Sequence, residues 1–440
     1  MRWKETEYNG WGRVLKATGR VARPEKPSAL TGIFTENPSP AIGALRSYGD
    51  AALNSDRDVI QMTRLDRFIG FTPETGILEA EAGVSITDIL STFSPQGWMP
   101  AVMPGTGFAT LGGCIANDVH GKNHHGAGTF GDHIESIELL MADGKVKRLS
   151  ANRNKDLFRA TIGGLGQTGV ILSAKIRLKP CTSRLIQVDE RRADSLTEFM
   201  GMLETSTATY CVGWIDATAK GSALGRGILE EAELTSSNMT PKLRKARKIP
   251  MDAPSFALSP PTVRMFNKAY FNRIPEQGRG VLRSLEDFFF PLDKIHDWNR
   301  LYGKRGFHQF QCVLPDETAE ETLTEMLRRI SKSGLASPLA VLKRTGGGTA
   351  GHLTFPIKGF TLALDFANAS GAEELVRGLN RLTANAGGRI YFAKDSLATP
   401  EDVAGMYPEM ADWQKIAGTA DPNRSFETDL TRRLKIRGAK

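Results

Sequence analysis

The stretch PGTGFATLGGCIANDVHGKNHH, from Pro104 to His125, combines closely spaced glycines with small hydroxyl side chains and a histidine-rich end. A shorter stretch of similar character, AIGALRSYGD (Ala41–Asp50), precedes it. Glycine lets backbone N–H groups approach a ligand closely and point at an anion. Either stretch alone is more typical of a tight turn. Two such loops in one domain predict a site that encloses a long, flat, anionic cofactor.

A third glycine-rich segment, GGLGQTG (Gly163–Gly169), has the G-x-G-x-x-G spacing of a dinucleotide fingerprint. That fingerprint needs a strand before it and a helix after it, so that the helix N-terminus faces the pyrophosphate. Here the helix signal of Asn154–Thr161 comes first and the strand signal of Gly169–Pro180 follows. The reversed order excludes a Rossmann-type site.

The bulk composition is that of a globular protein. The 440 residues are 40% apolar and 24% charged, and this length is typical of two domains or one large composite domain. No apolar run approaches the length of a membrane helix, and the N-terminus lacks a signal-peptide pattern, so we expect a cytoplasmic protein. The four cysteines are widely spaced, which predicts buried thiols and not a zinc site or a disulfide framework.

The net charge of +8 suits anionic partners such as phosphates, nucleic acid or anionic lipid. The run PKLRKARK (Pro241–Lys248) supplies several of these cations within a segment rich in Pro, Ser and Met, which predicts a solvated, mobile loop. A nucleic-acid-binding protein is an alternative from another class, but the sequence has no recognisable nucleic-acid motif. We therefore expect no nucleic-acid partner.

Strand and helix signals come in blocks along the chain. SIELLMADGKVKRL (Ser136–Leu149) predicts a hairpin around Asp143-Gly144, and Ser85 is the predicted N-cap of a short helix. RIYFAKDS (Arg389–Ser396) predicts a strand. Apolar residues at helical spacing predict three further helices, Leu196–Thr205, Glu317–Ser333 and Ala372–Gly388. These blocks predict an α+β fold.

Taken together, these segments resemble a known family. The order RSYGD, PGTGFATLGG, HGKNHH and GGLGQTGVI is similar to that of the vanillyl-alcohol-oxidase (PCMH-type) superfamily of FAD-binding oxidoreductases. Within it, HGKNHH resembles the decaprenylphosphoryl-β-D-ribose 2′-oxidase family. Downstream matches are DWNRLYG (Asp297–Gly303), FHQFQ (Phe307–Gln311), LTFPIKGF (Leu353–Phe360) and MYPEMADW (Met406–Trp413). The resemblance covers nearly the whole chain except the stretch around residues 230–275.

The resemblance implies an architecture. A two-part, PCMH-type FAD-binding domain would comprise residues 1–184 and a C-terminal return over residues 389–440. An α+β substrate or cap domain, residues 185–388, would be inserted between the two parts. The composition change near Pro180 and the predicted helix end at Gly388 agree with that division.

The resemblance also implies which residues contact FAD. In the first loop, near the pyrophosphate and ribityl groups, they are Gly43, Arg46, Ser47, Tyr48, Gly49 and Asp50. In the second, along the diphosphate and isoalloxazine, they are Gly105, Thr106, Thr110, Gly112, Gly113, Asn117 and His120, and Leu172 and Tyr391 complete the set. Many relatives attach FAD covalently through a histidine in the first loop. RSYGD contains no histidine, so we expect noncovalent FAD.

Lys394, in YFAKDS, and His120 match the catalytic positions of the family. The implied reaction is oxidation of a secondary alcohol, in which carbon loses a hydride and the hydroxyl loses a proton. A lysine in a low-dielectric pocket can take that proton because desolvation lowers its pKa. The sequence does not decide between Lys394 and His120 as the proton acceptor. Without the resemblance, a lysine in a strand would be interpreted as a surface charge.

The implied substrate-side residues are Lys122, Trp214, Gln309, Gln311, Lys343 and Lys394. Ala363 stands where well-known members carry a cysteine, and Thr361 replaces an Asn, so the exact substrate stays open. The expected function is oxidation of the 2′-hydroxyl of a polyprenyl-phosphate-linked ribose, the flavin half of a ribose-to-arabinose epimerisation. The alternative is an aldonolactone or other sugar-alcohol oxidase on the same fold.

The histidines of the second loop also allow a metal site to be considered. A metal needs convergent side chains, whereas adjacent His124 and His125 would diverge and no carboxylate or cysteine cluster accompanies them. We expect no metal, and structural hydrogen bonds for His124, His125 and His133. The expected partners are a lipid-linked sugar phosphate, an NAD(P)H-dependent short-chain reductase that completes the epimerisation, and a membrane surface that the basic run contacts peripherally.

Overall fold

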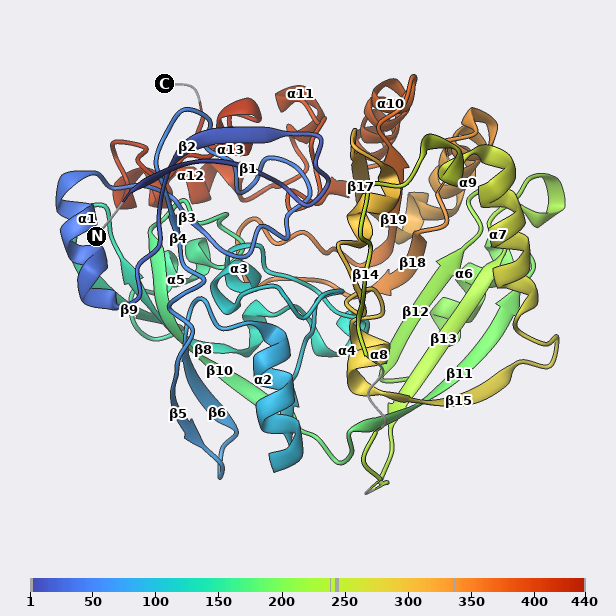
Figure 1. The fold of residues 1–440 in the computed structure, drawn as a ribbon, viewed down its shortest axis with the longest axis horizontal. Helices are drawn as coiled ribbons and strands as arrows, with labels where there is room; N and C mark the ends of the chain where they lie inside the picture. Colours follow the sequence, from blue (N-terminus) through green and yellow to red (C-terminus); the bar gives the residue numbers. More distant parts are fainter. Residues whose placement is uncertain (1–2, 238, 242–244, 336, 439–440) are drawn as a thin grey trace.

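The strands of the protein assemble into sheets of four, six, eight and two strands (Figure 1). This computed structural model describes residues 3–237, 239–241, 245–335 and 337–438. In Figure 1 the four- and six-stranded sheets lie on the left and the eight-stranded sheet on the right. The combination of separate sheets and helices confirms the predicted α+β class.

The four-stranded sheet carries the first glycine-containing loop. Its strands, in spatial order, are β1 (Lys4–Asn9), β2 (Lys16–Ala22), β4 (Val59–Gln61) and β3 (Ala41–Ile42), and α1 (Pro27–Glu36) connects β2 to β3. β1 and β2 are antiparallel, whereas β4 pairs in parallel with β2 and β3. The loop that follows β3 therefore leaves the sheet from its edge strand.

The six-stranded sheet supports the second loop. Its strands are β5 (Phe68–Thr72), β6 (Ile77–Glu81), β10 (Val170–Pro180), β8 (Ile134–Leu140) and β9 (Val146–Ser150), and β7 (Trp98–Pro100) also pairs with β10. Its helices are α2 (Ile86–Phe93), α3 (Leu111–Ala116), α4 (His124–Ala127) and α5 (Lys155–Thr161), with 3-10 turns η1 (Ser94–Gln96) and η2 (Gly131–His133).

Local predictions in this region are confirmed. β8 and β9 pair as a hairpin whose turn contains Gly144 at a φ of +79°. The side chain of Ser85 accepts a hydrogen bond from the backbone N–H of Asp88 and caps α2. α5 precedes GGLGQTG and β10 follows it, which is the reverse of the dinucleotide-binding order.

The eight-stranded sheet has one covered face. Its order is β15 (Arg279–Ser284), β11 (Leu185–Ala193), β13 (Gly227–Leu234), β12 (Tyr210–Ile215), β18 (Ala340–Thr345), β19 (Gly359–Ala367), β17 (Phe307–Pro315) and β20 (Arg389–Ile390). The predicted helices form as α6 (Leu196–Thr205), α9 (Asp316–Ser333) and α10 (Ala372–Asn385). Their apolar residues pack against the strands in one core cluster, which includes Phe199, Leu323 and Leu379.

The segments between β13 and β17 lie beside this sheet. They contain β14 (Arg247–Lys248) and β16 (Ile295–His296), which pair in parallel, together with α7 (Pro260–Asn272) and α8 (Leu285–Phe289). The 3-10 turns are η3 (Gly221–Ala223), η4 (Ser255–Leu258) and η5 (Trp298–Tyr302). Lys242, Leu243 and Arg244 of the basic run lie outside the described residues, and Lys245–Lys248 are exposed.

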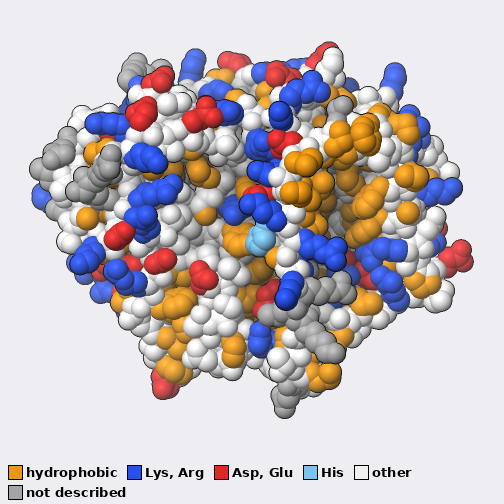
Figure 2. Space-filling view, viewed as in Figure 1, with side chains coloured by type: hydrophobic (Ala, Val, Ile, Leu, Met, Phe, Trp, Pro, Cys, Tyr) orange, Lys and Arg blue, Asp and Glu red, His pale blue; other side chains and the backbone are white. Residues whose placement is uncertain are grey.

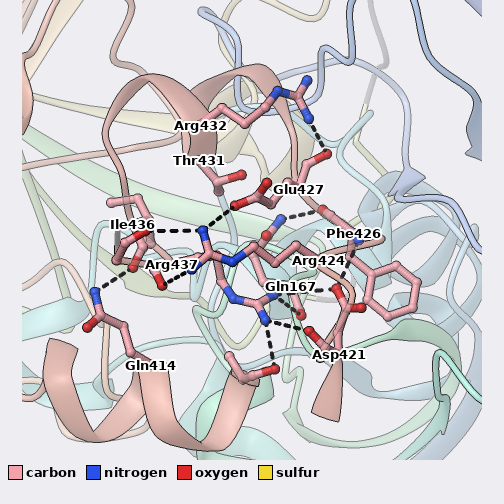
Figure 3. Close-up of polar contacts among 12 residues, drawn as sticks. Gln167, Gln414, Asp421, Arg424, Phe426, Glu427, Thr431, Arg432, Ile436 and Arg437 are labelled. Carbon is pink, nitrogen blue, oxygen red and sulfur yellow. Dashed lines mark hydrogen bonds and ion pairs between the residues drawn. The ribbon is translucent and has the colours of Figure 1, made fainter. Parts of the chain in front are cut away.

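The C-terminal segment returns to the left side of Figure 1 as α11 (Pro400–Val403), α12 (Met410–Ala420) and α13 (Asp429–Arg433). Figure 3 shows the contacts that hold it, centred on the buried Arg437 guanidinium. Arg437 pairs with Asp421 at 3.5 Å and donates hydrogen bonds to the carbonyls of Ala417 and Gln167. The tail is thereby joined to the loop that precedes β10.

The predicted strand over Arg389–Ser396 is wrong for most of its length. Arg389 and Ile390 form β20, but Tyr391–Lys394 is a turn in which the N–H of Lys394 donates to the carbonyl of Tyr391 at 2.9 Å. The chain turns here because Ala393 pairs with the first loop, where its carbonyl accepts from the N–H of Tyr48. The domain boundaries at residues 184 and 388 stay predictions. The chain passes from the six- to the eight-stranded sheet between β10 and β11.

Candidate functional site

A cavity of about 1620 Å³ lies between the sheets, lined by both loops, one face of the eight-stranded sheet and the turn at Tyr391–Lys394. The predicted site residues that line it are Gly43, Arg46, Ser47, Tyr48, Gly105, Thr106, Thr110, Gly112, Gly113, Asn117, His120, Lys122, Trp214, Gln309, Gln311, Lys343, Tyr391 and Lys394. Residues from distant parts of the chain therefore meet at one site.

Backbone pairing fixes the first loop. The N–H groups of Trp11 and Gly12 donate to the carbonyls of Ser47 and Tyr48, at 2.8 and 3.1 Å. The N–H of Tyr48 in turn donates to Ala393 at 2.9 Å. The loop is thus held between the N-terminal hairpin and the C-terminal turn, and this places Ser47 in the same cavity as Lys394.

The two loops touch each other at Gly43 and Thr110. Thr110 caps α3 by accepting a hydrogen bond from the N–H of Gly113, and a Cβ added at Gly43 would lie 2.4 Å from the Thr110 Oγ1. A Cβ added at Gly112 would lie 2.9 Å from the Cβ of Ala82. Small residues are required because the two backbones approach each other and the sheet so closely.

The lining contains buried polar atoms that no side chain or backbone group satisfies among the described residues. They include Arg46 Nε, Asn117 Oδ1 and His120 Nδ1. The Arg46 guanidinium lies between the rings of Trp11 and Phe108, at 4.2 and 4.8 Å, and burial lowers its pKa. A buried unpaired polar atom costs free energy unless a ligand binds it. These atoms and the glycine-lined loops fit a cofactor with a diphosphate and a flat polar ring.

Lys394 lies deep in the cavity. Its Nζ lies 3.7 Å from the centre of the Tyr48 ring, a cation–π contact. Burial lowers the Lys394 pKa from 10.5 to about 7, with repulsion from Lys343 acting in the same direction and attraction to Asp365 opposing it. An amine in this environment exchanges its proton near neutral pH.

His120 is buried, and its hydrogen bond with Gln311 determines which ring nitrogen carries the proton. The Nε2 atoms of His120 and Gln311 are 3.1 Å apart. An amide nitrogen only donates, so the His120 Nε2 accepts and the ring proton resides on Nδ1. Burial, followed by repulsion from Lys343, His124 and Lys394, holds the His120 pKa well below its usual value. His120 is therefore neutral at physiological pH.

One face of the eight-stranded sheet supplies the opposite wall. Gln309 pairs with Asp365, Gln311 with Ala363, and Lys343 with Thr361 across adjacent strands. Residues two apart on a strand share a face, and from this face Gln309, Gln311, Ala363 and Lys343 line the cavity. The Gln309 amide donates to Asp365 at 2.5 Å, and burial raises the Asp365 pKa to about 6.

Two further lysines line the cavity, Lys343 from this wall and Lys122 from the second loop. Burial lowers the pKa of Lys343 and of Lys122 to about 8 each. The Lys122 Nζ donates to the carbonyl of Phe288 and lies 3.9 Å from that residue's ring centre. Buried cations favour an anionic ligand beside them.

The remaining histidines of the second loop are structural, as predicted. The His124 Nδ1 accepts from the N–H of Gly346, and burial lowers the His124 pKa to about 4. His125 and His133 each place Nε2 2.9 Å from a backbone carbonyl, those of Ala208 and Ala127. The four cysteines are buried free thiols, which confirms that prediction too.

Three predicted cofactor contacts, Gly49, Asp50 and Leu172, do not line the cavity. The Asp50 carboxylate accepts two hydrogen bonds from Arg433, at 2.8 and 2.7 Å, whereas beside a diphosphate it would be repelled. Leu172 packs against a core cluster, whereas its neighbour Ile171 lines the cavity. Gly49 allows close approach to the C-terminal turn, where an added Cβ would lie 1.8 Å from the Asp395 carbonyl oxygen.

Sequence reasoning missed Asp365, Tyr302 and Trp11. Asp365 binds Gln309 and accepts a hydrogen bond from the Tyr302 hydroxyl at 3.1 Å. Strand alternation from Ala363 points to Asp365 and would have found it. Nothing near Trp11 in the sequence indicates that its ring packs on Arg46, because that contact depends on the N-terminal hairpin.

Residues 35–150, which include both loops, match the family described as "FAD binding domain". Over nearly the whole chain, the protein is similar to decaprenylphosphoryl-beta-D-ribose oxidase of Mycolicibacterium smegmatis, with 36% identity over 447 residues that cover 97% of each chain.

Other relatives are similar to a smaller part of this chain. An uncharacterized protein of Streptomyces coelicolor is 34% identical over 77% of this chain and 96% of its own length. L-gulonolactone oxidase of Scyliorhinus torazame is 27% identical over 37% of this chain and 36% of its own length. The likeness to the lactone oxidase thus covers about a third of the chain.

Proposed function

Because the chain belongs to the family of FAD-dependent oxidoreductases that includes decaprenylphosphoryl-beta-D-ribose oxidase, we propose that it oxidises the 2′-hydroxyl of a polyprenyl-phosphate-linked ribose to a ketone. The observation that carries the proposal is the convergence of Lys394, His120 and Gln311 in one cavity with Lys343 and Lys122. This set offers a proton acceptor, neutral hydrogen-bonding groups and cations for a phosphate.

The chain binds FAD, and the residues that would hold it line the glycine-rich part of the cavity. Arg46 and the loop of Gly105 and Thr106 suit the diphosphate, while Asn117 and Tyr391 suit the flavin ring. When bound, FAD supplies the oxidant that removes a hydride from a carbinol carbon. No histidine lies in the first loop, so the proposed attachment is noncovalent.

Lys394 is the proposed proton acceptor. The His120 Nε2 lone pair is engaged by Gln311 and its Nδ1 carries the ring proton, so neither nitrogen is free to accept a second proton. The Lys394 pKa of about 7 leaves a large fraction of neutral amine at physiological pH. As the carbinol carbon becomes a carbonyl carbon, the hydroxyl proton passes to Lys394 Nζ, while His120 and Gln311 orient the sugar.

The test is anaerobic mixing of the holoenzyme with candidate substrates while the visible absorbance of the flavin is followed. A short-chain polyprenyl-phosphoryl ribose is expected to bleach the flavin, and an aldonolactone is expected not to. Bleaching by the lactone alone would overturn the assignment in favour of a lactone oxidase. If a free pentose bleached the flavin as fast as the phospho-linked one, the phosphate-binding role proposed for Lys122 and Lys343 would be contradicted.

The proposal includes two associations, one with a reductase and one with a membrane surface. The ketone has to be reduced from the opposite face to give arabinose, and an NAD(P)H-dependent short-chain reductase is the partner whose chemistry fits. The lipid-linked substrate also implies peripheral contact with a membrane, and each cation of the basic run near an anionic surface contributes about 1 kcal/mol. Among the described residues, no helix is long and apolar enough to cross a membrane.

The reductase association has its own experiment. The oxidase with an electron acceptor alone should accumulate the ketone, and a short-chain reductase with NADH should convert that ketone to the arabinose derivative. Formation of arabinose without any reductase would contradict the two-enzyme scheme.

A further inference from the structure

Six large hydrophobic side chains are exposed around the mouth of the cavity. They are Met251, Phe256, Met265, Phe266, Leu282 and Leu301, with exposed fractions of 72, 72, 70, 48, 48 and 38%. We call them the apolar rim. Figure 2 shows hydrophobic side chains gathered on this part of the surface, with lysine and arginine side chains beside them. Exposed apolar patches of this kind mark sites of interaction with another apolar surface.

The apolar rim is continuous with the cavity. Phe266, Leu282 and Leu301 line the cavity as well as its outer edge, and Ala257 and Leu258, which follow Phe256, also line it. η4 is fastened to α7, because the carbonyl of Phe256 accepts from the N–H of Ser259 and from the Thr262 hydroxyl. Phe266, Leu282 and Leu301 are therefore part of the wall of the site, whereas Met251, Phe256 and Met265 lie outside the lining.

An aromatic path leads from the rim toward the lysines. The ring of Phe266 stacks on Tyr270 at 5.8 Å, and Tyr270 contacts Trp214 at 4.7 Å. Trp214 lies opposite Val341 on β18, and Lys343 shares that face two residues further on. All five residues line the cavity. An apolar chain that enters over Phe266 would thus reach the cationic wall without crossing polar surface.

The charged side chains of α7, beside the rim, are cations. Between Ala253 and Pro275 the sequence contains no Asp or Glu, while Arg264 and Lys268 lie exposed on α7. Arg247 in β14 is exposed too, whereas Lys248 pairs with Asp297 at 3.4 Å, and Asp252, next to Met251, pairs with Arg13. A helix with exposed apolar side chains flanked by cations fits the interface of an anionic bilayer, where the apolar groups enter the acyl boundary and the cations meet headgroups. The exposed cations of α7 favour this anionic surface over an uncharged one.

We propose that the apolar rim, with Arg264 and Lys268, docks the enzyme on an anionic lipid bilayer, so that a polyprenyl tail passes from the bilayer over Phe266 and along the Tyr270–Trp214 path. The route of the tail rests on the function proposed above. Docking itself depends only on the surface and can be measured without substrate.

The experiment uses the FAD-loaded full chain and vesicles of equimolar phosphatidylcholine and phosphatidylglycerol. The variant Met251→Gln/Phe256→Ser/Met265→Gln changes rim residues that do not line the cavity. We expect it to lower vesicle binding at least tenfold. Arg264→Gln/Lys268→Gln should bind phosphatidylcholine vesicles as the wild type does and lose the preference for anionic ones. The matched control is Ile69→Gln/Val146→Gln, which removes exposed apolar side chains from β5 and β9 and should bind like wild type.

Turnover rates distinguish the docking proposal from the proposed oxidation reaction. On a water-soluble short-chain substrate the triple rim variant should match wild type, whereas on a long-chain substrate in vesicles its rate should fall with its binding. Wild-type binding to vesicles by the triple variant would overturn the docking proposal, even if the reaction is as assigned. So would a wild-type dimer that the triple variant dissociates, because a second copy would then cover the rim. If the wild type turned over neither substrate, the proposed reaction would be contradicted, but the vesicle-binding result would still test the docking proposal.

Discussion

At the scale of single residues, the site depends on a lysine that the fold removes from water. Lys394 has the Tyr48 ring beneath it and Asp365 as the charge that opposes desolvation. A buried amine is costly, and it persists here because its depressed pKa serves the proposed proton transfer. His120, neutral and held by Gln311, is suited to orient the sugar.

Replacing the amine tests this role. Lys394→Met is expected to lower kcat about 100-fold or more, since general-base catalysis contributes that much, while the bound flavin keeps its spectrum. Lys358→Met, at an exposed lysine just before β19, is the control and should retain wild-type kcat.

The pH dependence of kcat follows from the same pKa. The folded pKa of Lys394 is lowered to about 7, so the neutral, proton-accepting amine predominates above that pH and the ammonium form below it. We therefore expect kcat to rise with pH through about 7 in the wild type. A rate that falls with rising pH across this range would mean that the cation is the active form.

Gly49 offers a second test at this scale. A Cβ at this position would meet the Asp395 carbonyl oxygen at 1.8 Å, so Gly49→Ala should push the first loop away from the Lys394 turn. Overpacking of this kind costs roughly 1–3 kcal/mol of unfolding free energy. Urea denaturation would measure that loss and flavin titration the accompanying weaker FAD binding. Gly418→Ala, where an added Cβ meets nothing within 4 Å, is the control.

At the scale of elements, α13 ties together the two segments that carry Ser47 and Lys394. Arg433 on this helix binds Asp50, at the end of the first loop, and Asp395, next to Lys394, at 2.7 and 2.8 Å. Both carboxylates are buried. The helix thus positions two parts of the site although it contributes nothing to the cavity lining.

Removing the Arg433 ion pairs should lower both the unfolding free energy and the affinity for FAD. Arg433→Met leaves two buried carboxylates without their cation and should lower the unfolding free energy by about 3 kcal/mol, with weaker FAD binding. Adding Asp50→Asn should restore part of the loss, because it removes one of the unpaired charges. Unchanged flavin affinity in the single variant would show that α13 does not position the first loop.

At the scale of the whole molecule, the cavity is shared among the N-terminal sheet, the six-stranded sheet, the eight-stranded sheet and the C-terminal return. A ligand there binds only the folded chain, so it stabilises all of these parts together.

FAD removal is the corresponding test. Saturation at one hundred times Kd contributes about 2.7 kcal/mol, so the apoprotein should unfold at a lower Tm than the holoprotein, in a calorimetric scan. Denaturation by acid should release the flavin into the supernatant, since the proposed attachment is noncovalent. Colour that stays with the pellet would identify a covalent bond.

Much of the local structure could be predicted from the sequence. The hairpin at Gly144, the Ser85 cap and α6 follow from turn chemistry, capping and periodicity, which act between residues close in the chain. The reversed order around GGLGQTG also follows from neighbouring segments. The least successful local prediction was the strand at Arg389–Ser396, because a contact with the distant Tyr48 backbone turns that segment.

The sequence by itself determined the α+β class, the two glycine-rich loops and, through their order, the FAD-binding family. Only the tertiary structure decided that Asp50 binds Arg433, that Leu172 faces the core, that Asp365 stands behind Gln309, and that His120 presents Nδ1–H. The reason is physical. Backbone propensity and glycine spacing are local properties, whereas burial, charge pairing and tautomer depend on which residues the fold places within a few ångströms of each other.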